Sequence, residues 1–279
     1  MKVGSVPIGE KHAAKVMGVI NTSPESFYKG SVRTSEREIA ATAKQMRHDG
    51  AHIIDIGAMS TAPYLETLIP IEEEIRRMKR AIKVVKSACD LPVSADTPRA
   101  RVAEEAIADG ADAINDVTGL KYDPTMADVV AKAGVPVIAG AYSKAVATGK
   151  LAGTLQALKE SVALAKKARI VDVIIDPSIG FFRKEGKNQF FTKMTDMPWY
   201  TRDIEVLNNL NKLAAIKPVC VSVSRKSFIG HLLNVRAEDR LIPSIICEAI
   251  AVLNGASMVR THNVRETVRA LTMLQLLKP

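Results

Sequence analysis

The chain repeats one unit, in which a short apolar run rich in β-branched residues is followed by a segment with helical patterning. A glycine stands between the helical segment and the next apolar run at Gly50, Gly110, Gly134 and Gly255, and glycine readily ends a helix. Strands that alternate with helices pair in parallel, because each helix returns the chain across the sheet. The repeat therefore predicts an α/β protein with a parallel sheet.

Eight strands are expected. One is the run Val173, Ile174 and Ile175, with Val171 two residues before it, and such continuous apolar character is typical of a strand buried on both faces. The strands are predicted over residues 16–20, 52–56, 91–96, 112–116, 135–139, 173–175, 218–223 and 257–260. Helices are expected between them, the first capped by Thr34 or Ser35, whereas residues 184–201 are expected to be irregular. Eight such units with right-handed crossovers close into a (β/α)8 TIM barrel.

An open doubly wound sheet is the alternative architecture. The first strand is not followed by the GxGxxG fingerprint that marks the dinucleotide-binding form of such sheets. The length of 279 residues fits a barrel, which typically needs about 250. No stretch has the composition of a linker, so residues 1–279 are expected to form one domain.

The balance of charge favours an anionic partner. There are 39 Lys and Arg residues against 30 Asp and Glu residues, a net charge of +9, and such an excess attracts phosphorylated molecules or nucleic acid. Aromatic residues make up only 4% of the chain, which argues against a surface on which bases stack. A phosphorylated small molecule is therefore favoured over nucleic acid.

The cysteines and the apolar segments indicate a cytoplasmic protein. Cys89, Cys220 and Cys247 are widely spaced and lie in apolar surroundings, as buried thiols do in a reducing compartment. The N-terminus lacks the apolar core of a secretion signal. The longest apolar segment, residues 241–259, is interrupted by Pro243 and by polar residues, so no membrane span is expected.

Polar residues stand where the predicted strands end. A single Asp or Asn at such a place is an ordinary turn residue. In a TIM barrel, however, the carboxyl ends of all strands converge on one face, where the active site lies. Seven of the eight strand ends carry such residues, and together they indicate a ligand site: Asn21, Asp55, Asp96, Asn115 with Asp116, Asp176, Lys226, and Arg260 with His262.

The chemistry of this set fits a flat nitrogenous ring with a phosphate-type anion attached. Asp96, Asn115 and Asp176 offer hydrogen-bond acceptors, and a carboxylate pairs best with a planar pair of N–H donors such as a 2-amino-4-oxopyrimidine presents. Lys226 is placed to reach a ring oxygen or nitrogen. The eighth strand closes on the first, so Arg260 and His262 are expected beside Asn21, where they suit an anion and its Mg²⁺.

The sequence shows no sign of other common chemistries. It contains no GxSxG, HExxH, CxxC or P-loop motif. The remaining histidines are scattered, and surface or packing roles are expected for them: His12, His48, His52 and His231.

From about Val16 to its end the chain resembles the dihydropteroate synthase family. Each matching segment is modest, but their order and spacing are specific: MGVINTSPESF at 17–27, GAHIIDIGAMSTAP at 50–63, SADT at 94–97, GADAINDVTG at 110–119, IIDPSIGF at 174–181, SVSRKSFIG at 222–230 and VRTHNVRET at 259–267. The resemblance implies a TIM barrel, usually dimeric, that joins 6-hydroxymethyl-7,8-dihydropterin diphosphate to an aromatic amine and releases diphosphate.

The resemblance also implies roles for individual residues. It places Lys226, Asp96 and Asp176 in catalysis, and Mg²⁺ with the substrate diphosphate at Asn21. The substrate-binding residues would be Asn21, Thr61, Asn115, Arg225, Ser227, Arg260 and His262. Loss of diphosphate from a CH₂ group beside an electron-rich ring leaves cationic character on the carbon, so such a site must stabilise departing charge and position the amine instead of supplying a strong base.

Several positions depart from the family pattern. In the second loop, Met59 and Ala62 replace the Glu and Arg of GESTRPG, and in the first loop Lys29 replaces an acid. The fifth strand has Gly140 and Ala141 in place of Met-His, and Asn263 replaces Asp. We hypothesise that the acceptor is a bulkier arylamine with a phosphate, like that of archaeal methanopterin synthesis, held by Lys29 in the space beside Ala62. The alternative is neutral drift in variable loops, with p-aminobenzoate as acceptor and a role in folate biosynthesis.

Two other functions remain open. A pterin-dependent methyltransferase acting on a corrinoid protein would share Asp96, Asn115 and Asp176, but would have no use for the cationic residues around Arg260. A pterin-binding protein without turnover is the second, and the altered second loop leaves it open.

Overall fold

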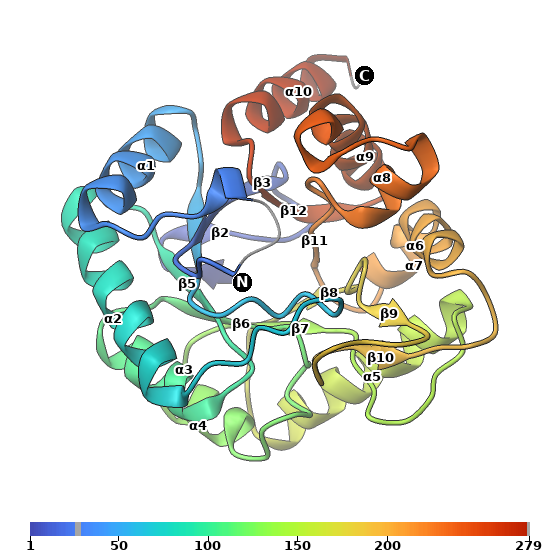
Figure 1. Ribbon diagram of the computed structural model, residues 1–279, viewed down its shortest axis with the longest axis horizontal. Coiled ribbons are helices and arrows are strands. Elements are labelled where there is room, and N and C mark those ends of the chain that lie inside the picture. Colours follow the sequence, from blue (N-terminus) through green and yellow to red (C-terminus); the bar gives the residue numbers. More distant parts are fainter. Residues whose placement is uncertain (26–28, 278–279) are drawn as a thin grey trace.

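The computed structural model of the protein describes residues 1–25 and 29–277, with only the backbone of Lys29, and its main feature is a closed barrel of parallel strands (Figure 1). The strands are β3 (Lys15–Asn21), β4 (Ile53–Gly57), β5 (Val93–Asp96), β6 (Ala113–Asp116), β7 (Val137–Gly140), β8 (Val173–Asp176), β11 (Val219–Val221) and β12 (Ala256–Thr261). Because β12 pairs with β3 and β11 pairs with β8, the sheet has no open edge. The predicted TIM barrel is confirmed, and the open-sheet alternative is wrong.

Helices surround the barrel on its outside (Figure 1). The first begins at Ser35, whose side chain accepts from the backbone of Glu38 at 3.3 Å while the Glu38 carboxylate accepts from the Ser35 amide at 3.0 Å, a reciprocal capping box. The helices are α1 (Glu36–His48), α2 (Ile71–Ala88), α3 (Ala100–Ala108), α4 (Met126–Ala133), α5 (Leu151–Lys167), α6 (Trp199–Asn208), α7 (Leu210–Ala214), α8 (Ser227–Leu233), α9 (Leu241–Leu253) and α10 (Val264–Leu277). Within the described ranges, no helix is both long and apolar enough to cross a bilayer.

The structure corrects two expectations and adds one element. Val171 precedes β8 and is 84% exposed, so it takes no part in the buried strand. The segment 184–201, expected to be irregular, contains β10 (Thr192–Lys193), which pairs with β9 (Phe182–Arg183), and the start of α6 at Trp199. The hairpin of β1 (Lys2–Val3) and β2 (Val6–Pro7) was not expected, because two-residue strands are too short to show periodicity.

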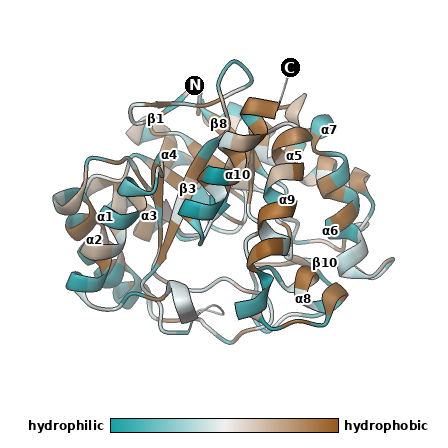
Figure 2. Ribbon diagram, turned by 90° about the horizontal axis from the view of Figure 1, so that it is seen from above, coloured by the Kyte–Doolittle hydropathy of each residue, from teal (hydrophilic) through white to brown (hydrophobic). Residues whose placement is uncertain are grey.

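The inside of the barrel has an apolar layer, closed off at one end by the N-terminal hairpin. Val3 and Ile8 pack against inward-facing strand residues, which are Met17, Ile53, Ala113, Ile138, Ile174, Cys220 and Met258. Figure 2 shows β1 at the end of the molecule opposite α8. This apolar layer forms the bottom of the barrel interior, below the carboxyl ends of the strands.

A polar layer follows two residues further along the strands. Side chains in a strand alternate between faces, so a residue two positions after an inward-facing one also points inward. The step from Ile53 leads to Asp55, from Ile174 to Asp176, and from Met258 to Arg260. The strand period therefore carries the polar side chains to the mouth of the barrel.

We predict that truncation of the apolar layer destabilises the fold strongly. Ile174→Ala leaves a cavity among close-packed side chains, and the expected loss in the free energy of unfolding is about 2–5 kcal/mol. The measurement is urea unfolding followed by circular dichroism. The control is Val171→Ala, two positions before β8, which is expected to change stability by less than about 0.5 kcal/mol because its side chain is exposed. Equal losses in the two variants would contradict the assignment of the layer.

Candidate active site

A pocket opens at the carboxyl ends of the strands, and most of the predicted site residues line it together. They come from segments far apart in the sequence, and they are Asn21, Thr61, Asp96, Asn115, Asp176, Lys226, Ser227, Arg260 and His262. The other lining residues are Met59, Ser60, Ala62, Pro63, Tyr64, Val117, Ser178, Ile179, Gly180, Phe181 and Ser222. The structure thus brings acids, amides and cations to one cavity, while the role of each in binding or catalysis stays a prediction.

Arg225 does not line this pocket. Its buried guanidinium donates from Nε to Oδ1 of Asn263 at 3.0 Å, and from Nη1 to the carbonyls of Ala237 at 2.8 Å and Glu238 at 2.9 Å. These contacts hold the segment between α8 and α9 against the start of α10, so Arg225 acts on the shape of the mouth in this structure. The side chain of Lys29 lies outside the described residues.

Two acids at strand ends have structural partners. Asp116 is fully buried and accepts from the backbone N–H groups of Thr118 at 2.8 Å and Leu120 at 2.7 Å, as a turn-forming Asp does. Asp55 is also fully buried and does not reach the pocket surface. Its carboxylate instead binds side chains that do.

Arg260 forms an ion-pair network with two acids across the barrel. Its Nε lies 2.6 Å from Oδ2 of Asp55, and its Nη2 lies 2.7 Å from Oδ2 of Asp96. Burial alone would lower the pKa of Arg260, but the two carboxylates raise it above its ordinary value. Burial raises the pKa of Asp96 to about 7, against the opposing pull of Arg260. Asp96 therefore changes its charge near neutral pH.

The ring-binding candidates keep acceptor atoms for a ligand. Asp176 accepts from the Ser178 amide with Oδ1 at 2.6 Å, and Asn115 donates from Nδ2 to Asp55 at 3.3 Å. Each therefore retains an oxygen that can accept from a ligand N–H. Burial raises the pKa of Asp176. These acceptors suit a ligand that brings its own N–H donors.

The basic residues of the pocket differ in charge. Burial lowers the pKa of Lys226 to about 8, opposed by the attraction of Asp176, and its Nζ lies 4.5 Å from the centre of the Phe181 ring. Burial, and then the positive charges of Arg260 and Lys226, lower the pKa of His262 to about 3. At neutral pH His262 is therefore neutral, and a bound anion would raise its pKa.

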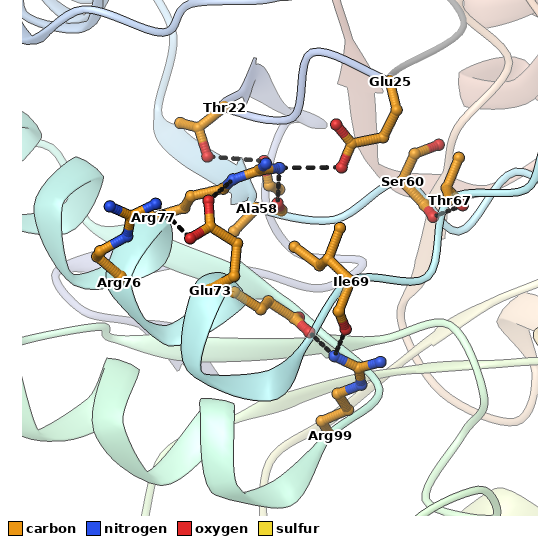
Figure 3. Close-up of polar contacts among 12 residues, drawn as sticks. Thr22, Glu25, Ala58, Ser60, Thr67, Ile69, Glu73, Arg76, Arg77 and Arg99 are labelled. Carbon is orange, nitrogen blue, oxygen red and sulfur yellow. Dashed lines mark hydrogen bonds and ion pairs between the residues drawn. The ribbon is translucent and has the colours of Figure 1, made fainter.

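The second loop, residues 58–70, is held over the mouth by arginines on the neighbouring helices (Figure 3). Arg77 on α2 donates from Nη1 to the carboxylate of Glu25 at 2.9 Å and to the carbonyl of Ala58 at 3.4 Å. Arg99, beside α3, donates from Nη1 to the carbonyl of Ile69 at 2.9 Å. Both ends of the loop are thus tied to the helical layer.

The middle of the second loop is tied to the segment between β9 and β10. Asn188 donates from Nδ2 to the carbonyl of Ala62 at 2.7 Å, and the Lys187 amide donates to the carbonyl of Pro63 at 2.7 Å. Ala62 is buried. The position at which the family has an arginine therefore takes part in this contact through its carbonyl and lies on the wall of the pocket.

Asn21 fits a shared role in binding Mg²⁺ with a substrate phosphate. Its Nδ2 donates to Ser31 at 2.8 Å, which leaves Oδ1 as a metal-type ligand. A Cβ at Gly57 would lie 3.0 Å from that Oδ1 and 3.9 Å from Oδ2 of Asp96. A side chain at position 57 would therefore crowd the Asn21 oxygen, and the glycine leaves that oxygen accessible. Among the described residues no cluster of His, Cys, Asp and Glu forms a complete metal site. Mg²⁺ is commonly held by one or two protein oxygens together with substrate phosphates.

Some lining residues were not identified from the sequence. Ser222 follows Cys220 by two positions, the same step that leads from Met258 to Arg260, so the strand period offered a signal for it. Tyr64 and Ser178 lie in loops, where no period exists, and only the tertiary structure places them.

The known proteins that are similar to this chain in sequence and those that are similar in structure are of the same kind. The family model described as pterin binding enzyme matches residues 17–262. A dihydropteroate synthase of Clostridium beijerinckii is 36% identical over 283 residues, covering 99% of this chain and 99% of that protein. The Bacillus subtilis dihydropteroate synthase is 34% identical, covering 95% of this chain and 88% of its own length.

Solved structures of similar proteins share the architecture. A Clostridium difficile dihydropteroate synthase determined in the presence of pteroic acid has a TM-score of 0.82 at 31% identity, covering 97% of this chain and 98% of that chain. The Xanthomonas albilineans dihydropteroate synthase with 4-aminobenzoic acid has a TM-score of 0.80 at 30% identity, covering 96% and 94%.

We predict that Arg260→Met destabilises the protein in a pH-dependent way. The change leaves two carboxylates without their cation, and removal of one partner of a buried pair costs about 3–5 kcal/mol. Arg260 opposes the rise in the pKa of Asp96, so without the cation that pKa rises further, the folded variant takes up protons, and its deficit shrinks as the pH falls. Urea unfolding at pH 8 and pH 5.5 measures this.

The control is Arg47→Met, which breaks an exposed ion pair with Asp90 and is expected to leave stability nearly unchanged at both pH values. If Arg260→Met lowers the free energy of unfolding equally at both pH values, the protonation of the carboxylates does not depend on the arginine.

Proposed function

The chain belongs to the pterin-binding enzymes and, within them, to the dihydropteroate synthase family, and from that premise we propose that it joins 6-hydroxymethyl-7,8-dihydropterin diphosphate to an arylamine, with release of diphosphate. The observation that carries the proposal is the single pocket in which Asp96, Asn115 and Asp176 lie with Lys226 and with Arg260. Acceptors suit the N–H edge of the pterin, and cations suit the departing phosphate oxygens.

The pterin ring would bind through complementary hydrogen bonds. Its amino and ring N–H groups pair with the carboxylate of Asp176 and with the acceptors of Asp96 and Asn115, while Lys226 donates to a ring oxygen or nitrogen. Buried polar groups that find partners only in the ligand favour that ligand strongly over an analogue without the donors.

The reaction is a displacement at the CH₂ group of the pterin. The C–O bond to diphosphate breaks, the amine nitrogen forms the new C–N bond, and the amine loses one proton. Arg260 and His262 would stabilise the departing negative charge, and Mg²⁺ at Asn21 would neutralise part of it. Lys226, beside the ring, holds the pterin in place for attack, so the chain supplies position and charge without a strong base.

The two alternative functions explain less of the site. A methyl transfer from a pterin to a corrinoid protein releases no anion, and would leave Arg260 and His262 without a role. A pterin-binding protein without turnover would use the ring contacts alone. The named relatives are synthases throughout their matched length, which supports the synthase proposal over both.

The acceptor is tested by direct turnover. Wild-type protein is incubated with dihydropterin diphosphate, Mg²⁺ and either p-aminobenzoate or a ribosylated aminobenzene phosphate, and released diphosphate is measured. Release that depends on an arylamine is expected. Turnover that is faster with p-aminobenzoate ends the hypothesis of a phosphorylated acceptor held by Lys29. Absence of diphosphate with every amine, alongside measurable pterin binding, would favour the non-catalytic alternative.

We predict a bell-shaped dependence of kcat/KM on pH. The rate rises as the pH passes about 7, where Asp96 becomes the carboxylate that pairs with the pterin, and falls above about 8, where Lys226 loses its charge. Asp96→Asn is expected to lower kcat/KM by about 10- to 100-fold, because it replaces a charged acceptor.

In Asp96→Asn the rising limb should also be absent from the residual activity, and diphosphate release across pH 5.5–9.5 measures both effects. A rising limb that persists in the variant would assign that ionisation to another group.

A homodimer is part of the proposal, and the surface of α9 supports it. Ile242, Ile246, Ile250 and Leu253 recur at helical spacing and are all exposed, with Ile242 at 72%. A stripe of this kind on one helix face is typical of a surface that another chain covers. Figure 2 shows this apolar colouring along α9. A cytoplasmic location also remains a prediction.

A further inference from the structure

Arg183, on β9, lies directly behind the wall of the pocket. Its Nη2 donates to Oγ of Ser227 at 2.6 Å, and its Nε donates to the carbonyl of Gly180 at 3.0 Å. Both of those residues line the pocket. Among the residues that the structure describes, no carboxylate oxygen lies within 4.0 Å of its guanidinium. Burial lowers the pKa of Arg183, and the carboxylate of Asp203 opposes this without forming an ion pair with it. Because a half-buried cation that forms no direct ion pair is costly for a fold, a role in ligand binding is indicated.

Aromatic rings fix the orientation of this guanidinium. Its Cζ lies 3.5 Å from the centre of the Trp199 ring and 5.9 Å from that of Tyr64, which belongs to the second loop. A guanidinium stacked on a ring directs its N–H groups along its own plane. Arg183 therefore joins the second loop, β9 and α6 behind one wall of the pocket.

The contact with Ser227 determines what that hydroxyl offers to a ligand. A serine hydroxyl has one donor and two acceptor positions. Because its oxygen accepts from a cation, the hydroxyl proton is directed elsewhere, and the positive charge behind it makes Ser227 a stronger donor. The group exposed to the pocket is thus an O–H that favours an anion.

This donor lies beside the ring-binding residues. A Cβ built on Gly180 would be 3.4 Å from Cδ of Lys226 and 4.0 Å from Nη2 of Arg183, so the lysine and the arginine flank the same glycine. Gly180 has a φ of +85°, which other residues rarely adopt. An acceptor with its amine near Lys226 can therefore extend an anionic group to Ser227.

We propose that Arg183 is the residue that makes the site specific for an arylamine with an anionic substituent, through Ser227. This inference rests on the proposed function. The shared chemistry is a carboxylate or a phosphate on the ring, remote from the amine. Arg183 acts as a positioning residue, since its neighbour Ser227 makes the contact.

The test compares three acceptors in wild-type protein and in Arg183→Met. The acceptors are p-aminobenzoate, 4-aminophenyl phosphate, and 4-aminobenzamide as the neutral isostere. Loss of a charge-assisted hydrogen bond is expected to raise KM for the preferred anionic acceptor by about 10- to 100-fold, with kcat little changed. KM for 4-aminobenzamide should stay within about threefold. The anionic acceptor whose KM rises more in the variant identifies the substituent that the site prefers.

Two further variants serve as controls. Arg183→Lys keeps the charge and is expected to restore most of the preference for the anionic acceptor, which a purely structural role would not predict. Lys184→Met removes an equal charge from the adjacent, exposed position and should leave all three KM values unchanged. An equal loss for charged and neutral acceptors in Arg183→Met would overturn the inference.

Calorimetric binding of p-aminobenzoate and 4-aminobenzamide to the wild type and to Arg183→Met separates this inference from the proposed function. If no diphosphate is released with any amine, the proposed function fails, while selective loss of p-aminobenzoate binding in the variant still supports the role of Arg183. If turnover is observed but the variant binds p-aminobenzoate as tightly as the wild type, the inference alone fails.

Discussion

The ion pair between Arg260 and two carboxylates is the interaction on which the site depends. Arg260 lies on β12, whereas Asp55 and Asp96 lie on β4 and β5, so the side chain reaches across β3 inside the barrel. This contact makes it possible to place acids beneath a binding site for an anion, because each charge offsets the other. Breaking it would leave carboxylates buried at the centre of the molecule.

Other arginines hold the loops around the pocket by hydrogen bonds to backbone carbonyls. Arg202 is fully buried and donates to the carbonyls of Pro177 at 2.6 Å and Ser178 at 3.2 Å, directly after β8. Arg77 and Arg99 hold the second loop in the same way, and Arg225 holds the segment before α9. Irregular segments have carbonyls without secondary-structure partners, and a guanidinium with five donors satisfies several at once. Part of the positive charge of the chain therefore supports the loops internally.

The sequence predicted the barrel because two of its signals are local. Continuous apolar runs such as Val173 to Ile175 and hinge glycines such as Gly50 specify strands and helix ends from neighbouring residues alone. It predicted the convergence of Asp96, Asp176 and Arg260 because strand ends in a closed parallel barrel must meet. Residues whose positions depend on packing escaped this reasoning. Asp55 and Arg225 were named from the sequence, but their partners on other elements were not, and Arg183 lies on a two-residue strand whose partner is equally short.

What the sequence determined by itself is therefore the architecture and the chemical types gathered at its mouth, since both follow from the period of side chains along strands. What only the tertiary structure decided is which of those groups remain available to a ligand. Asp55 is buried with its Oδ2 bound to Arg260 and Asn115, and Asp116 is bound by its own turn, whereas Asp176 keeps an oxygen for a ligand and Arg183 forms no direct ion pair among the described residues. Hydrogen bonds between distant segments settle that question, and the geometry of such bonds exists only once the chain has folded.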